Sequence, residues 1–446
     1  MKKLSFLILT IVIVLLCSSV VYATAGDNGD DGDESTEVEL FTTEYPEDLT
    51  HAPDLVSDCA IIMDANTGQI LYEKNAYEAR YPASITKVLT MLVALENSDL
   101  DETVTFSEDA IWNIDRDSSH IALDVGEQIS VEDCLYAIAI ASANEAAYGL
   151  AEHVGGDLEG FADLMNQKAT DLGCKNSHFV NANGLQDENH YTCAYDMALI
   201  TREALNLKMF RTLTSAKSYT IPATNLQDAR PLYSKNKILK SSSEYYYEYA
   251  EGSKTGYTTD SLNTLVTYAK KDDLELICVV LKCKGAKNAY TDTRALFTYC
   301  YNNYQLSYPL SDFTFESLDD TSNNYITTNY NNTITHDTLS YAIDNSFSVL
   351  IPSNADLTKL VKNVEFYDTP DKKGNAGKIT ISYNEQVLGE TFITYTSTDE
   401  TSNPYTTEEK TDKTSISLKT ILIIGGIVIG VIFIILVILK IYLTNV

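Results

Sequence analysis

Basic residues are scarce in this sequence. Its 446 residues include 32 Lys and Arg against 63 Asp and Glu, so the formal net charge is −31 at pH 7. Nucleic-acid backbones are bound by cationic surfaces, and this imbalance therefore excludes nucleic acid as a main partner. Charged residues make up 21% of the chain and hydrophobic residues 44%, which excludes wholesale disorder and indicates a globular protein.

Sequence patterns that bind metals or build a disulfide framework are also absent. No two of the 8 Cys are spaced as CxxC, no HExxH occurs, and the 6 His are dispersed without ligand spacing. Apart from Cys17, the Cys are odd in number and lie in apolar segments, so most are predicted to be small buried side chains. A single bridge stays open as an alternative. We predict no metal site and no cofactor.

The first 25 residues have the layout of a secretory signal peptide. Lys2 and Lys3 form a charged region, Phe6 to Leu16 an apolar run, and Ala23 to Ala25 a small-x-small cleavage site. An uncleaved N-terminal anchor is the alternative. We therefore predict a signal peptide over residues 1–25 and export of the chain that follows it.

A long apolar run lies near the other end of the chain. Ile421 to Leu439 are apolar or Gly without interruption, and Ile441 to Leu443 extend the run past Lys440. At about 1.5 Å per residue, it spans a hydrocarbon core of roughly 30 Å. We predict one transmembrane helix over residues 417–443. With the N-terminus exported, this predicts a single-pass protein of the cell membrane whose main domain is extracytoplasmic.

Composition divides the rest of the chain into four stretches. Residues 26–50 carry ten acidic residues and no Lys or Arg, so residues 26–52 are predicted to be a disordered acidic leader. Residues 53–307 mix helical and strand periodicity and form the predicted main domain. Residues 308–398 show short alternating runs that are typical of a small all-β domain. Residues 399–416 are rich in Thr and Ser and are predicted to form a stalk.

Periodicity places helices and strands within these stretches. Strands of the main domain are expected at Ala60–Asp64, Ile70–Tyr72, Thr264–Tyr268 and Leu274–Leu281. Its helices are expected from Pro82 onward and at Val131–Leu150, Leu158–Leu172, Tyr195–Leu207 and Thr291–Tyr301. Later strands are expected at Phe347–Ile351, Val364–Tyr367, Ile379–Tyr383 and Thr391–Tyr395. Both element types therefore occur within this one domain.

A Ser-x-x-Lys motif opens the first helix. Ser84 and Lys87 share one helix face, so the Lys87 amine can reach the Ser84 hydroxyl. A Ser hydroxyl becomes a nucleophile when a neighbour takes its proton, and a desolvated Lys among cations can be that base. The motif is weak alone, because Ser234 to Lys237 match it too. That second match has no apolar helix face to position a base.

Two further motifs are weak in isolation. Ser142-Ala143-Asn144 lies in an Ala-rich segment, where its polar side chains need partners; helix capping is the ordinary alternative.

Lys254-Thr255-Gly256 precedes an apolar strand pair. There Lys254 adds positive potential, the Thr255 hydroxyl can bind a carboxylate, and Gly256 allows close approach to the backbone. A simple turn is the alternative.

The order of the three motifs is a signature of penicillin-recognising serine enzymes. With them, the sequence resembles the serine-type D-alanyl-D-alanine carboxypeptidases (peptidase family S11), low-molecular-weight penicillin-binding proteins of bacteria. The resemblance covers roughly residues 55–395. Besides the motifs, it rests on Asp64–Asn75, Arg80–Lys87, Asn181–Leu185, His190-Tyr191, Ala194–Ala198 and Lys373–Ile379.

The resemblance implies a β-lactamase/transpeptidase-like α+β fold, with a central antiparallel sheet flanked by helices, a helical lobe and the active site between them. It implies removal of the terminal D-Ala from peptidoglycan stem pentapeptides, with β-lactams as inhibitors. The implied catalytic residues are Ser84 as nucleophile, Lys87 as base, Ser142 as proton relay and Asn144 for positioning. Lys254 and Thr255 would bind the terminal carboxylate, with Gly256 in the same strand. The N–H groups of Ser84 and Tyr257 would form the oxyanion hole.

A departure from the family pattern affects carboxylate binding, and three alternatives to the carboxypeptidase remain. Where relatives often carry Arg before an aromatic residue, this chain has Ala289-Tyr290, so Lys254 would bind the carboxylate with less help.

A serine β-lactamase shares the motifs but would need a Glu-x-x-Leu-Asn segment that is absent here. A D,D-transpeptidase or endopeptidase differs only in the acceptor or the bond attacked. A non-catalytic membrane-anchored binder of wall peptides is the third alternative.

Overall fold

The computed structural model describes residues 51–115, 117–313, 339–367, 371 and 374–397. The signal peptide, almost all of the acidic leader, the stalk and the transmembrane helix that the sequence predicts lie outside these residues. Within them, no helix is both long enough and apolar enough to cross a membrane. The described residues fall into two compact units, of which the first holds residues 51–311, 346–362 and 381–389.

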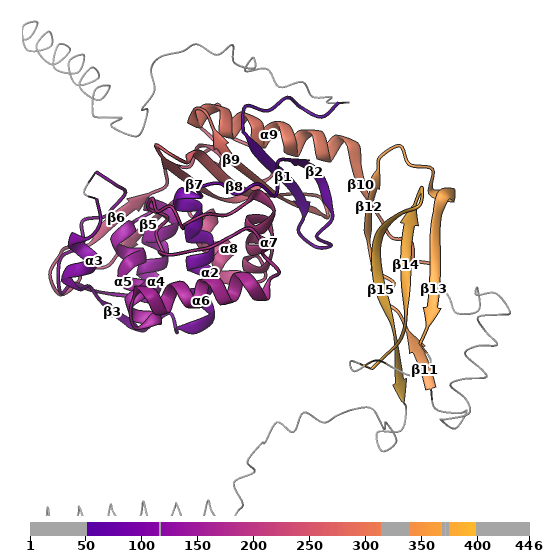
Figure 1. Ribbon diagram of the computed structural model, residues 1–446, viewed down its shortest axis with the longest axis horizontal. Coiled ribbons are helices and arrows are strands. Elements are labelled where there is room, and N and C mark those ends of the chain that lie inside the picture. Colours follow the sequence, from indigo (N-terminus) through magenta and orange to yellow (C-terminus); the bar gives the residue numbers. More distant parts are fainter. Residues whose placement is uncertain (1–50, 116, 314–338, 368–370, 372–373, 398–446) are drawn as a thin grey trace, which may run out of the picture. The chain divides into compact units, whose positions relative to one another are not determined.

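A five-stranded antiparallel sheet forms the centre of the first unit (Figure 1). Its strands follow the order β2 (Ile70–Lys74), β1 (Cys59–Asp64), β9 (Leu274–Cys283), β8 (Leu262–Lys271) and β7 (Ala250–Thr258). In the register of β1 and β9, Cys59 pairs with Leu281 and Asp64 with Leu276. Every residue of β1 is buried, so this strand is covered on both faces.

The sheet has an apolar cluster on each face because successive side chains of a strand point in opposite directions. On β9, Ile277 and Val279 belong to one buried cluster, whereas Cys278 and Val280 belong to the other. Both faces therefore need a helical cover.

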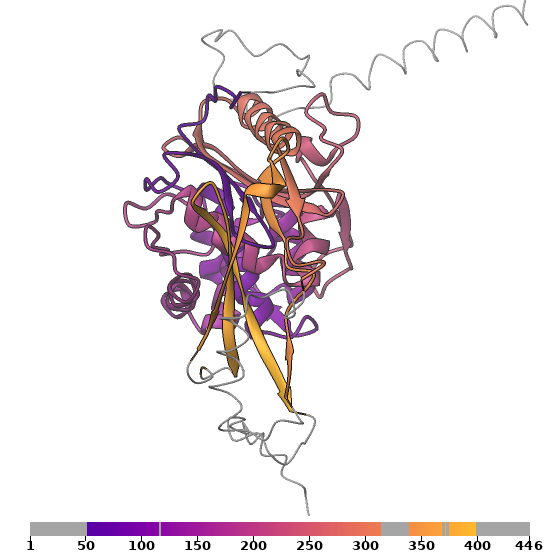
Figure 2. The same cartoon turned by 90° about the vertical axis from the view of Figure 1, so that its right-hand side faces the viewer.

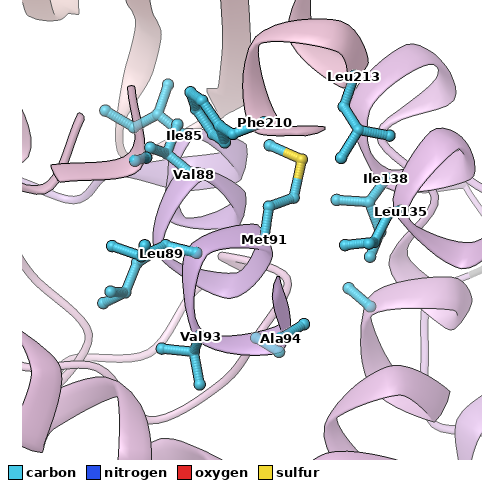
Figure 3. Close-up of a cluster of buried hydrophobic side chains, with 14 of the residues drawn as sticks. Ile85, Val88, Leu89, Met91, Val93, Ala94, Leu135, Ile138, Phe210 and Leu213 are labelled. Atoms are coloured by element: carbon cyan, nitrogen blue, oxygen red, sulfur yellow. The ribbon is translucent and has the colours of Figure 1, made fainter. Parts of the chain in front are cut away.

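Helix α9 (Ala286–Asn303) covers one face of the sheet, and the other helices lie on the opposite side (Figure 1 and Figure 2). These are α2 (Lys87–Asn97), α4 (Val131–Tyr136), α5 (Asn144–Gly155), α6 (Leu158–Asp171), α7 (Ala194–Ala204) and α8 (Lys208–Ser215). Helix α2 is buried along most of its length. Figure 3 shows its Met91 directed toward Leu135 and Ile138 and toward Phe210 and Leu213.

Short elements complete the first unit. They are α3 (Glu108–Trp112), the pair β3 (Thr103–Thr105) and β4 (Gln128–Ser130), the pair β5 (Ser218–Ile221) and β6 (Arg230–Tyr233), and the 3₁₀ turn η4 (Lys237–Leu239). Ser130 caps α4 through a reciprocal pair of hydrogen bonds with Asp133, which satisfies N–H groups that the helix start leaves free.

Two predicted helices differ from the structure. The helix expected from Pro82 begins as a 3₁₀ turn, η2 (Ala83–Thr86), before α2. The helix expected over residues 131–150 is broken: α4 leads into a π-helix, η3 (Ala137–Ala141), Ser142 takes a left-handed φ of 57°, and α5 follows. In both places, polar side chains of the segment form hydrogen bonds with distant elements, which are described with the site below.

The later strands are described by themselves. Strand β10 (Tyr304–Ser307) pairs with β12 (Val349–Pro352). A four-stranded sheet has the order β11 (Leu339–Ala342), β15 (Gln386–Ser397), β14 (Asn375–Tyr383) and β13 (Leu360–Phe366), with the 3₁₀ turn η7 (Leu357–Lys359) preceding β13. The four alternating runs predicted after residue 307 overlap β12, β13, β14 and β15.

Candidate active site

The Ser-x-x-Lys motif lies where η2 joins α2. Ser84 is partly exposed in η2, and Lys87 is the first residue of α2 and fully buried. Nζ of Lys87 lies 3.0 Å from Oγ of Ser84. Ahead of Ser84, Ala83 has a φ of 49°, and the Pro82 carbonyl accepts a hydrogen bond of 2.8 Å from the hydroxyl of Thr264 on β8. The sheet thus holds the nucleophile segment in a strained, fixed conformation.

Two acceptor-only oxygens bind the Lys87 nitrogen. Nζ donates to Oδ1 of Asn144 over 2.7 Å and to the carbonyl of Asn183 over 2.5 Å. Burial, together with the nearby Lys254 ammonium, holds the pKa of Lys87 well below its ordinary value. As a neutral amine, Lys87 would use both N–H groups on these oxygens, which leaves its lone pair for the Ser84 hydroxyl. This is the geometry of a general base.

A short chain of hydrogen bonds orients the Asn144 amide. Its Nδ2 donates to Oγ of Ser118 over 2.9 Å, and Ser118 Oγ donates to the Asp115 carbonyl over 2.5 Å. Because the Ser118 hydrogen is used on Asp115, the Ser118 oxygen can only accept from Asn144. Oδ1 of Asn144 must therefore face Lys87.

The second and third motifs meet through Ser142 and Lys254. Nζ of Lys254, on β7, donates to Oγ of Ser142 over 2.9 Å and to the Thr255 carbonyl over 2.8 Å. Lys254 is buried, which lowers its pKa to about 7. The left-handed break after η3 turns Ser142 toward β7, while Asn144 begins α5 and faces Lys87. The two lysines therefore reach the site from two different elements, Lys87 from α2 and Lys254 from β7.

Gly256 allows β7 to lie directly against the nucleophile segment. A Cβ at this position would be 2.8 Å from the backbone N of Ser84 and 2.5 Å from Oγ1 of Thr264. No side chain fits there. The strand therefore lies directly beside the Ser84 backbone N, and Tyr257 follows Gly256 in the same strand.

Sequence reasoning assigned no role to the segment after α6, although it contributes to the site. Besides the Asn183 carbonyl, it supplies Gly184, where φ is 80° and a Cβ would meet the Ala83 carbonyl at 2.0 Å. It also supplies buried His190, whose Nε2 lies 2.8 Å from Oγ1 of Thr86. Asn181–Leu185 and His190-Tyr191 resemble the family pattern, and this resemblance could have indicated that the segment belongs to the site. The contact of the Asn183 carbonyl could not be predicted, because every residue type has a backbone carbonyl.

Protonation of His190 follows from its partners. The N–H of Val180 donates to Nδ1 over 3.1 Å, so the ring hydrogen lies on Nε2 and is donated to Thr86. Burial lowers the pKa of His190 to about 4. His190 is therefore a neutral link between this segment and the motif.

Other sequence candidates lie elsewhere. Ser234 and Lys237 are on the loop before and at the start of η4, and Lys237 is exposed. Ala289 is buried in the cluster under α9 and brings no charge to the site. Within the described part of the chain, no group of three His, Cys, Asp or Glu side chains could hold a metal ion.

A model of the peptidase S11 family, described as D-alanyl-D-alanine carboxypeptidase, matches residues 47–285. The D-alanyl-D-alanine carboxypeptidase DacF of Bacillus subtilis is 34% identical over 256 residues, covering 56% of this chain and 63% of DacF. DacA of Haemophilus influenzae is 30% identical over 260 residues, covering 57% of this chain and 64% of DacA. The chain thus spans slightly less than two thirds of the length of these relatives.

Solved structures show the same fold. The Streptomyces K15 DD-transpeptidase aligns with a TM-score of 0.53 and 28% identity over 56% of this chain and 98% of that chain. The predicted α+β, transpeptidase-like fold is thereby confirmed for this part of the chain.

Proposed function

The chain belongs to the D-alanyl-D-alanine carboxypeptidase family, peptidase family S11, and on that basis we propose that it removes the terminal D-Ala from stem pentapeptides of bacterial peptidoglycan. The observation that carries this proposal is the Lys87 nitrogen, buried and 3.0 Å from the Ser84 hydroxyl, with its N–H groups committed to two acceptors. The site supplies a nucleophile, a base and, beside them, a cation for the substrate carboxylate.

Acylation then proceeds in balanced steps. Oγ of Ser84 attacks the carbonyl of the penultimate D-Ala while its proton passes to Lys87. The oxyanion accepts hydrogen bonds from the N–H groups of Ser84 and Tyr257. When the peptide bond breaks, Ser142 passes a proton to the leaving D-Ala amine and takes one in return from the Lys87 ammonium, so that Lys87 is again a neutral amine. Water then hydrolyses the acyl-enzyme, and free carboxylate and Ser84 hydroxyl result.

Recognition of the substrate's end rests on β7. Lys254 and the Thr255 hydroxyl bind the terminal carboxylate. Position 289, where relatives often carry an Arg, is a buried Ala and adds no charge to this interaction. β-Lactams carry a carboxylate and a reactive amide in a similar arrangement, so they acylate Ser84 and inhibit the enzyme.

The test measures free D-alanine released from a pentapeptide ending in D-Ala-D-Ala, with fluorescent penicillin labelling in parallel. Wild type is expected to show both signals. Ser84→Ala is expected to lose both by at least about 10³-fold, because the nucleophile is gone. Labelling without release would favour a non-hydrolytic acyl-transfer role. Neither signal from a folded wild-type protein would reject the enzyme and favour a non-catalytic binder.

A D,D-transpeptidase is the second candidate, favoured by the likeness to the structure titled Streptomyces K15 DD-transpeptidase. It would pass the same acyl group from Ser84 to an amine instead of water. Adding a D-amino acid or a glycyl amine acceptor to the assay separates the two. A carboxypeptidase yields mainly the tetrapeptide, and a transpeptidase yields the amine adduct at the expense of the tetrapeptide.

We also propose that the enzyme acts outside the cell membrane. The apolar runs at residues 1–25 and 417–443 support a signal peptide and a single membrane anchor. The strands after residue 307 support a small β domain over residues 308–398, with residues 399–416 as stalk. Membrane fractionation and protease treatment of intact cells test this. A chain that stays soluble, or is protected from external protease, would contradict it.

A further inference from the structure

A cavity of about 370 Å³ lies next to the nucleophile segment but outside the three motifs. Tyr81, three residues before Ser84, forms part of its wall. The turn between β7 and β8 contributes Asp260 and Ser261, and the segment after α6 contributes Glu188 and Tyr191. The proposed mechanism uses none of these side chains.

The direction of β7 relates this cavity to the substrate. Lys254 and Thr255, which bind the terminal carboxylate in the proposed mechanism, precede Tyr257, whose N–H faces the scissile carbonyl. A bound stem peptide therefore runs antiparallel to β7, and its earlier residues pass beyond Thr258 toward the β7–β8 turn. At about 3.3 Å per extended residue, the residue before D-Ala-D-Ala comes next to this turn.

The walls of the cavity are held in place without a ligand. The Ser261 hydroxyl accepts from the N–H and the hydroxyl of Thr258 over 2.9 and 2.8 Å, and Ser261 is buried. Backbone hydrogen bonds in both directions tie Arg80 to Thr192, next to Tyr191. A cavity fixed in this way binds without a large ordering cost.

The charges that line the cavity favour a cationic guest. Arg80 also lines it, but its guanidinium is occupied: it donates to Asp58 over 2.8 Å and to Glu78 over 2.6 Å. By contrast, Glu188 and Asp260 make no hydrogen bond or ion pair with the described residues. Lys282 is the remaining cation of the wall and lies 3.9 Å from Asp58. The uncompensated charge in the cavity is therefore negative.

The aromatic rings add to this preference. Tyr81 and Tyr191 lie in the wall beside the two carboxylates, and the face of an aromatic ring attracts an ammonium group. A long methylene chain that ends in an ammonium fits such a cavity better than a carboxylate or a purely apolar side chain does.

We propose that this cavity is a substrate subsite that takes the side chain of the diamino acid before D-Ala-D-Ala and selects its free ammonium through Glu188 and Asp260. The inference rests on the proposed function and names the class of stem peptide that the enzyme prefers: one whose third residue is not yet acylated or cross-linked at its side-chain amine.

The experiment compares two pentapeptides with the full-length protein, L-Ala-γ-D-Glu-L-Lys-D-Ala-D-Ala and the same peptide with Nε-acetyl-L-Lys. The readout is the ratio of KM values for D-alanine release. Wild type is expected to bind the free-amine peptide about 10-fold better, as two partly exposed charge contacts would give. In the double variant Glu188→Gln, Asp260→Asn this ratio is expected to fall toward one.

The variant Glu159→Gln, on the exposed side of α6, removes one negative charge away from the cavity and should leave the ratio unchanged. Fluorescent penicillin labelling verifies that each variant is folded. Equal KM values for both peptides in wild type, or an unchanged ratio in the double variant, would overturn the subsite while leaving the carboxypeptidase intact. No D-alanine from either peptide would instead reject the proposed function, and the subsite with it.

Discussion

At the residue scale, the proposed role of Lys87 as a base depends on the acceptors that surround its nitrogen. Asn144 and Asn183 take the two N–H groups of a neutral Lys87. Lys254 nearby opposes a second positive charge. Because repulsion by Lys254 lowers the pKa of Lys87, Lys87 is the first of the two lysines to lose its proton, and the remaining positive charge stays on Lys254.

This ordering predicts the pH dependence of activity. The pKa of Lys87 is lowered, so acidification protonates it, removes the lone pair and lowers kcat/KM. Burial lowers the pKa of Lys254 to about 7, so above that pH its charge is lost and KM for the carboxylate-ending peptide rises. Steady-state kinetics across the pH range check both limbs. Lys254→Arg keeps its charge and should remove the alkaline rise in KM; a KM in wild type that stays flat through pH 8 contradicts the assignment.

Ser118 provides a second test at this scale. In Ser118→Ala the Asn144 amide loses its acceptor and is free to turn its NH₂ toward Lys87, which would remove the Oδ1 contact. We expect kcat for D-alanine release to fall roughly 10-fold, the value of one lost hydrogen bond at the reacting group. Ser118→Thr keeps the hydroxyl and should restore activity. Equal loss in both variants would indicate that only the packing of this loop matters.

At the element scale, periodicity predicts the layers but not the breaks that make the site. The nearly continuous apolar runs of β1 and β9 and the apolar face of α2 are visible in the sequence because burial dictates them. The 3₁₀ start of η2 and the π-helix η3 are not, because Ala and Ile in η3 suit an ordinary α-helix equally well. The break after η3 is accompanied by hydrogen bonds that Lys254 donates to Ser142 and Lys87 donates to Asn144, both from elements distant in the sequence.

The segment after α6 gives a matched pair of glycines for a test. Gly184 and Gly173 both have positive φ, at 80° and 83°. A Cβ on Gly184 would meet the Ala83 carbonyl, whereas a Cβ on Gly173 would meet no atom within 4 Å. Gly184→Ala is expected to displace the Asn183 carbonyl and the Ser84 segment and to lower penicillin acylation by about 10²-fold.

The control, Gly173→Ala, carries only the backbone cost of about 1 kcal/mol. It should lower the melting temperature slightly and keep normal acylation. If both variants acylate at the wild-type rate, the close approach at Gly184 does not position the nucleophile.

At the scale of the whole molecule, two apolar clusters on either side of one sheet stabilise the described part of the chain, in which no disulfide is formed. All 7 described cysteines are free, and six of them are buried. Burial raises the pKa of the Cys59 thiol to about 11, and it raises those of Cys278 and Cys300 as well. Their odd number and apolar surroundings predicted that most of these cysteines are small buried side chains. No disulfide bridge is formed among them.

A reducing agent should therefore leave the unfolding temperature unchanged, and thiol reagents should react slowly with the native protein. Thermal unfolding with and without dithiothreitol is the measurement, since loss of a native disulfide typically costs about 2–5 kcal/mol. A clear drop in the unfolding temperature on reduction would contradict a fold held by packing alone.

The π-helix η3 has a consequence for how this protein tolerates change. Each residue of an α-helix advances about 100° around the axis. Deleting any one of Ala137–Ala141 would let α4 run on as a regular helix and would rotate everything that follows it. Asn144 would then turn away from Lys87 although no site residue had been altered. In this stretch, an exchange of one small apolar side chain for another is tolerable, but the number of residues is fixed.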